Sequence, residues 1–136
     1  MKTVFLMVMI VSSISFANRE SGGRGRGTAV YVDFRSFGTG IDGVTAKRTQ
    51  QLINEAKMNG QVIDQTFEQK GREGETLICV ELTDAFLRYH LVKALAPLIS
   101  ADKKRLGRER TVVYVGNVCG DVSHATEQNI EAYLKP

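Results

Sequence analysis

Two cysteines, Cys79 and Cys119, and two histidines, His90 and His124, carry the most reactive side chains of this chain. A catalytic thiolate needs a nearby base, but His90 falls in a segment expected to form a helix on the opposite side of a sheet from Cys79. The spacing of the four residues also matches no zinc-binding pattern. We therefore predict no catalytic cysteine–histidine pair, no metal site and no cofactor.

The alternative for the cysteines is one disulfide bond, as is common in exported proteins. The strand that carries Cys79 and the strand that precedes Cys119 are expected two places apart in the sheet, about 10 Å. Bridged Cα atoms usually lie within about 7 Å of each other, so the bond requires the chain to turn back over the sheet after Gly116. If the bond does not form, Cys79 is a free thiol among charged side chains.

A set of polar side chains is expected on one face of two neighbouring strands. Alternation along residues 28–36 and 75–82 places apolar side chains on one face and the polar set on the other. The members of this open sheet face are Tyr31, Asp33, Arg35, Cys79 and Glu81. We interpret the face as a binding surface, on which an Asp and a Glu can share acid and base roles. The alternative interpretation is a solvated face with cross-strand charge pairs.

Residues 38–43 read G-x-G-x-x-G and stand between an expected strand and an expected helix. The pattern occurs in dinucleotide-binding folds, but the next strand here enters a hairpin, where those folds need another crossover helix. We interpret the segment as a turn in which Asp42 caps the helix. A small anion bound by Gly38, Gly40 and Gly43 at the helix start is the alternative.

The expected elements follow the order strand, helix, strand, strand, helix, strand. Their ranges are 28–36, 43–59, 61–69, 75–82, 85–100 and 111–118. The order predicts an α+β fold, a ferredoxin-like βαββαβ sandwich over residues 28–119 with a four-stranded antiparallel sheet and two helices on one face. Right-handed crossovers place the first strand between the third and fourth, and the second strand at an edge with Ile63 and Phe67 inward.

Two segments beside this framework are also assigned. Residues 101–110 are strongly basic and are expected to form a solvated loop. Residues 120–136 are expected to be a C-terminal extension containing a short helix, over about 121–134.

The N-terminus resembles an export signal. Residues 1–17 combine a lysine, a short apolar run and small residues at Ser15 and Ala17, which is typical of a secretory signal peptide. A retained membrane anchor is the alternative, but the apolar run is shorter than the roughly 20 residues of a spanning helix. Residues 18–27 are expected to be a flexible Gly/Arg leader. We therefore predict export to the periplasm or the cell exterior, with no membrane span after cleavage.

These observations favour an exported, non-enzymatic binding or interaction domain whose partner is an unknown protein or polar ligand. Binding is expected on the open sheet face or by addition of a strand at the edge strand 61–69. The alternative is a small anion- or phosphate-ester-binding hydrolase that uses Gly38–Gly43 and Arg35. Nucleic-acid binding is a weaker alternative, because the formal net charge of the 136 residues is only +3. The oligomeric state is left open.

Overall fold

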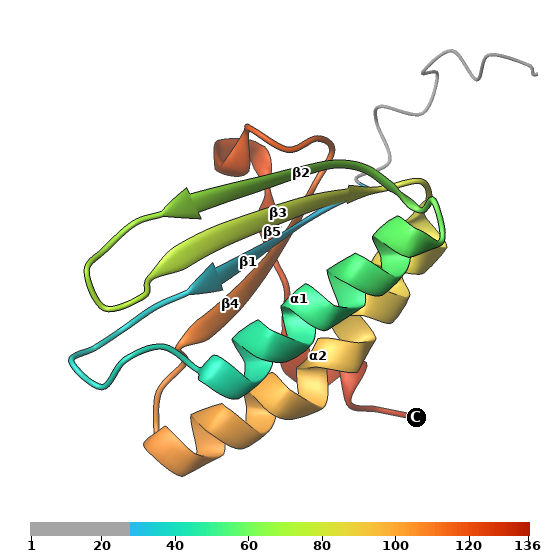
Figure 1. Cartoon of the computed structure of the whole chain (residues 1–136). Coiled ribbons are helices and arrows are strands. Elements are labelled where there is room, and N and C mark those ends of the chain that lie inside the picture. The colour runs from blue at the N-terminus through green and yellow to red at the C-terminus, as the bar shows by residue number, and fades with distance from the viewer. Residues whose placement is uncertain (1–27) are drawn as a thin grey trace, which may run out of the picture.

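The computed structural model describes residues 28–136, so the predicted signal peptide (1–17) and Gly/Arg leader (18–27) lie outside the described residues. A five-stranded antiparallel sheet, in the order β2-β3-β1-β4-β5, is covered on one face by α1 and α2 (Figure 1). The elements are β1 (Ala29–Phe34), α1 (Gly43–Met58), β2 (Val62–Gln69), β3 (Thr76–Leu82), α2 (Ala85–Leu106), β4 (Thr111–Gly116), η1 (Val122–His124), β5 (Thr126–Glu127) and α3 (Ile130–Tyr133).

The α+β class and the relative order of the first four strands are confirmed. The prediction of a four-stranded sheet is wrong, because the short strand β5 pairs with β4 and adds a fifth. A strand of two residues is too short to show a period-2 pattern, so periodicity along the sequence could not predict β5.

Local capping signals explain where both long helices begin. The carboxylate of Asp42 accepts a hydrogen bond from the Thr45 amide at the start of α1, and that of Asp84 accepts one from the Leu87 amide at the start of α2. Each satisfies an amide that has no partner within the helix. The predicted cap of α1 at Asp42 is therefore confirmed.

Helix α2 is longer than predicted. It continues through Pro97 to Leu106 and ends at Gly107, whose φ of +71° is the left-handed conformation that favours glycine. Basic side chains in its last turn interact favourably with the helix dipole. The prediction of a solvated loop over residues 101–110 is wrong, because most of this segment is helix and Arg110 is buried.

The main hydrophobic core lies between the sheet and the helices. Apolar side chains on alternate positions of β1 and β3 meet α1 and α2, as the period-2 pattern predicted. The buried members from these elements include Val30, Val32, Phe34, Ile53, Ile78, Val80, Leu82, Leu91, Val92 and Leu95.

Strand β2 departs from the prediction. Ile63 and Phe67, expected inward, are 61% and 63% exposed. The strand lies at the rim of the sheet, while α1 and α2 cover the centre of the sheet (Figure 1). A bulge between Val62 and Asp64 also interrupts the regular ladder at the start of the strand.

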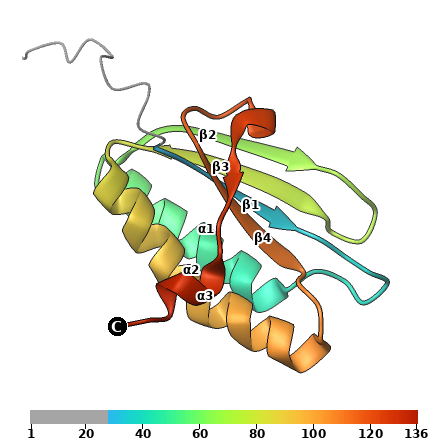
Figure 2. The same ribbon diagram turned by 180° about the vertical axis from the view of Figure 1, so that it is seen from behind.

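The C-terminal segment wraps the edge of the sheet at β4 instead of forming one helix over 121–134. After β4 it passes over the face that α1 and α2 leave free, forms η1 and β5, and ends in α3 beside α2 (Figure 2). Ile130 of α3 joins the main core. Within residues 28–136, no helix is long and apolar enough to cross a membrane.

Candidate functional site

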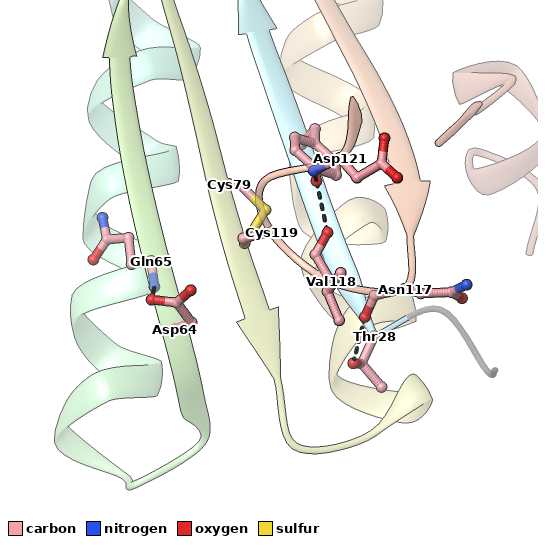
Figure 3. Close-up of a disulfide and its surroundings, with 9 residues drawn as sticks. Thr28, Asp64, Gln65, Cys79, Asn117, Val118, Cys119 and Asp121 are labelled. Carbon is pink, nitrogen blue, oxygen red and sulfur yellow. Dashed lines mark hydrogen bonds between the residues drawn. A yellow bond between two sulfur atoms is a disulfide. The ribbon is translucent and has the colours of Figure 1, made fainter. Parts of the chain in front are cut away.

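A disulfide joins Cys79 of β3 to Cys119, with the Cα atoms 5.7 Å apart (Figure 3). The bond forms because the chain turns back over the sheet after Gly116. A Cβ atom at Gly116 would lie 3.4 Å from both the Tyr31 ring and the Ala125 side chain, so a glycine allows the close approach. Of the two alternatives for the cysteines, the structure shows the disulfide, and Cys79 is not a free thiol.

Tyr31 anchors the same segment by hydrogen bonds. Its hydroxyl donates to the Val118 carbonyl at 2.6 Å and accepts from the Asp121 amide at 3.0 Å. Its side chain is 2% exposed and packs in a second apolar cluster with Cys79 and Leu77. The sheet face predicted to be open is therefore closed over Tyr31 and Cys79, because residues 117–127 cover it.

The charged residues of this face are paired with one another. Arg35 Nε lies 2.9 Å from Asp33 Oδ2, and Arg35 Nη2 donates to the Tyr114 hydroxyl at 2.8 Å. Lys70 Nζ lies 3.8 Å from Asp33 Oδ1. Burial alone would lower the pKa of Arg35, but the hydrogen bond and charge of Asp33, with Tyr114, outweigh it and raise that pKa. The charges of this face are therefore paired, but not across neighbouring strands as the alternative interpretation expected: Asp33 and Arg35 belong to one strand and its extension, and Lys70 follows β2.

Glu81 belongs to a separate acidic group. Ligand atoms of Asp64, Glu81 and Cys119 lie within 4.8 Å of one another. Because the Cys119 sulfur is bonded to Cys79, it cannot act as a thiolate ligand. Two carboxylates remain, of the exposed Asp64 and the partly exposed Glu81, which is fewer than the three or four protein ligands of a typical metal site.

The glycine loop is held by a buried arginine. Arg110 Nη1 donates to the Gly40 carbonyl at 3.0 Å, and its Nη2 bonds Asp102 Oδ1 at 2.6 Å. Gly38 and Gly40 have φ values of +81° and +75°, and Gly43 is the first residue of α1. The loop thus connects β1 to α1 in a conformation that Arg110, directly before β4, and Asp102 of α2 help to maintain.

The start of α1 already holds a negative charge. The buried Asp42 carboxylate occupies it, accepting hydrogen bonds from both the amide and the hydroxyl of Thr45. A second anion at Gly38, Gly40 and Gly43 would be repelled by this carboxylate. Arg35, the predicted helper of that site, bonds instead to Asp33 and Tyr114.

The histidines lie apart from the disulfide. His90 lines an apolar groove of about 350 Å³ between α1 and α2, and its ring centroid is 4.1 Å from that of Phe86. His124 Nδ1 lies 2.6 Å from Asp121 Oδ2 and 3.3 Å from Ser123 Oγ. Because Asp121 and Ser123 meet the same ring nitrogen, the imidazole cannot pass a proton from one to the other as in a catalytic triad.

Strand β2 presents a free edge of eight residues. The Gln65 amide donates to the side chain of Asp64 at 2.8 Å, so it does not take part in the ladder with β3. The Lys70 amide donates to the Glu75 carbonyl across the hairpin at 2.8 Å. With the exposed side chain of Phe67, this edge combines backbone groups that bond to no neighbouring strand and an apolar contact surface.

Comparisons with protein-family models, with curated proteins and with solved structures found no match to this chain. The site therefore has to be judged on its own geometry.

Sequence reasoning gave the covering segment only as a condition of the disulfide alternative, and it missed the buried Arg110–Asp102 pair. A tyrosine on a polar strand face, followed much later by a second cysteine between two glycines, was the available sign of the covering segment. No comparable sign pointed to the buried arginine, because nothing in a run of cations indicates which one is buried. The cations of this run are Lys103, Lys104, Arg105, Arg108 and Arg110.

Proposed function

We propose that this chain is an exported, non-enzymatic interaction domain, a ferredoxin-like βαββαβ core with an added fifth strand, that binds its partner by strand addition at β2. The observation that carries the proposal is the free edge of β2 with its exposed Phe67. Strand addition supplies main-chain hydrogen bonds for affinity and alternate side chains for specificity.

Two further observations support it. Disulfides persist in oxidising compartments, which fits the Cys79–Cys119 bond and the predicted signal peptide. Asp33, one of the two acid–base candidates, is engaged with Arg35, and Tyr31 and Cys79 are buried structural contacts. The edge of β2 is therefore a better binding surface than the covered sheet face.

The test uses a random peptide library displayed on phage, selected against the folded chain. Enriched peptides should shift the amide resonances of residues 64–69 in NMR spectra. Phe67→Ser should abolish their binding, because the exposed ring supplies the apolar contact at this edge.

Phe86→Ser is the matched control, because Phe86 is 69% exposed on α2, away from the edge. It should leave peptide binding unchanged. Enriched peptides that shift resonances elsewhere, or bind the Phe67→Ser variant equally well, would contradict the proposal.

A further inference from the structure

We propose that the partner of β2 is a second copy of this chain, with the two β2 strands paired antiparallel about a twofold axis at Phe67. The inference rests on the proposed function and names the partner of the same edge. Two five-stranded sheets would thereby join into one continuous sheet.

The direction of the backbone groups limits the possible registers. In an antiparallel strand a residue points its N–H and C=O to one neighbour, and the next residue points them to the other side. The Lys70 amide bonds across the hairpin to Glu75, whereas the Gln65 amide does not bond to β3. Odd-numbered residues from Gln65 to Gln69 therefore point their backbone groups away from β3, and only registers that place odd residues opposite odd residues fit. The Gln65 amide, which bonds to Asp64 in the single chain, would exchange that bond for one to the copy.

Charge excludes two of the remaining registers. An axis at Thr66 places Asp64 opposite Glu68 of the copy, twice, and an axis at Glu68 places this carboxylate opposite itself. Like charges directly opposite each other destabilise a strand pair. An axis at Gln65 extends the pairing into the bulge between Val62 and Asp64, where the regular ladder ends. An axis at Gln69, the last residue of β2, extends the pairing to Gly71 in the hairpin turn.

An axis at Phe67 satisfies both conditions. It places Phe67 opposite Phe67 of the copy, and Asp64 opposite Lys70 of the copy in two equivalent pairs. Gln65 then lies opposite Gln69 within the strand, and Lys70 directly follows the last residue of the strand. The segment is thus complementary to itself in charge and in apolar contact.

The side-chain faces agree with this register. Asp64 is opposite Glu81 of β3, on the sheet face away from the helices, and Lys70 reaches Asp33 on that same face. Phe67 is opposite Ile78, on the helix-facing side. Oppositely charged side chains therefore meet on one face, while the two phenyl rings, 63% exposed in the single chain, cover each other on the other face.

Charge reversal tests the register by sedimentation equilibrium. Asp64→Lys places two lysines opposite each other in the dimer, and Lys70→Asp places two aspartates opposite each other. Each variant alone should therefore dimerise about tenfold more weakly than the parent chain. An equimolar mixture of the two variants should recover dimers. In the mixed dimer, the two lysines at positions 64 and 70 of one strand face the two aspartates at positions 70 and 64 of the other. Lys47→Asp, a matched reversal on an exposed position of α1, should leave dimerisation unchanged.

Cross-linking provides a second readout. Residues at the axis form a hydrogen-bonded pair with Cα atoms about 5.5 Å apart, within the range of about 4.4–6.8 Å that a disulfide spans. Phe67→Cys should therefore form an interchain disulfide, and Gln65→Cys should not. Preferred cross-linking through Gln65→Cys would overturn the proposed axis.

The outcomes separate this inference from the proposed function. A chain that remains monomeric but still binds displayed peptides at residues 64–69 overturns the second copy as the partner and leaves strand addition intact. A dimer that neither charge variant weakens also overturns it. A chain that neither dimerises nor binds peptides at this edge contradicts both proposals.

Discussion

At the scale of single residues, Tyr31 shows how one hydroxyl group changes the role of a sheet face. Its position on β1 alternates with the core residues Val30 and Val32, so it points away from the helices. In a solvated face this hydroxyl would bond to water. Here it bonds to Val118 and Asp121 of the covering segment, and the side chain becomes part of a second apolar cluster.

Tyr31→Phe should therefore lower the free energy of unfolding by about 1–2 kcal/mol, because the Val118 carbonyl and the Asp121 amide lose a partly buried hydrogen-bond partner while the ring remains. Urea denaturation measures this change. Tyr89→Phe is the control: Tyr89 is more exposed, and the change should stay within about 0.5 kcal/mol. Equal effects of the two substitutions would show that the Tyr31 hydroxyl does not anchor the segment.

At the scale of secondary-structure elements, the Arg110–Asp102 ion pair joins the connection before β4 to α2 and to the glycine loop. Both side chains are buried, and Arg110 also bonds the Gly40 carbonyl. The hydrogen bond from Arg110 lowers the pKa of Asp102 against the opposing effect of burial, and Arg105 adds to the lowering. Because the folded pKa lies below the ordinary value of 3.8, this contribution to stability is present above about pH 4 and is lost as pH falls through the folded pKa.

Asp102→Asn should lower the free energy of unfolding near neutral pH by about 3–5 kcal/mol, because it leaves the Arg110 guanidinium buried without the one carboxylate that bonds to it directly. The free energy of unfolding of this variant should also fall less between neutral and acidic pH than that of the parent chain, because an asparagine at this position does not titrate. Denaturation at a series of pH values measures this difference. Arg105→Ala removes the exposed partner of the same carboxylate and should lower the free energy of unfolding by about 1 kcal/mol or less. Equal stability losses in the two variants would contradict the assignment of Arg110 as the structural partner.

At the scale of the whole molecule, the disulfide connects the C-terminal segment to the centre of the sheet. Cys79 lies on β3, and Cys119 lies at the start of the segment that continues through β5 to α3. The segment therefore contributes to both faces: it covers Tyr31 on one and adds Ile130 to the main core on the other. The same arrangement leaves β2, at the far edge of the sheet, without a covering element.

Removing the bond with the double substitution Cys79→Ala and Cys119→Ala should lower the free energy of unfolding by about 3–4 kcal/mol, because the unfolded chain regains the freedom of a loop of 40 residues. Hydrogen exchange should then accelerate most in residues 117–127. The amides of β2 serve as the internal control, because they lie at the opposite edge of the sheet. Unchanged stability and exchange would mean that hydrogen bonding alone holds the segment.

Features that depend on neighbouring residues could be predicted from the sequence. Asp42 identified the start of α1 through a side chain that reaches an amide three positions away. The alternation around Val32 and Val80 identified the apolar faces of two strands, and chain order with right-handed crossovers then determined where those strands lie. The presence of only two cysteines left a single possible intrachain bond.

What covers each surface depends instead on tertiary packing. Tyr31 and Glu81 follow the same polar alternation, yet Tyr31 is buried and Glu81 is partly exposed, because residues 117–127 pass over only part of the sheet. Phe67 has the spacing of a core residue, but it lies at a rim that the helices do not reach. Periodicity specifies which side of an element a side chain occupies, whereas burial depends on which distant segment packs against that side.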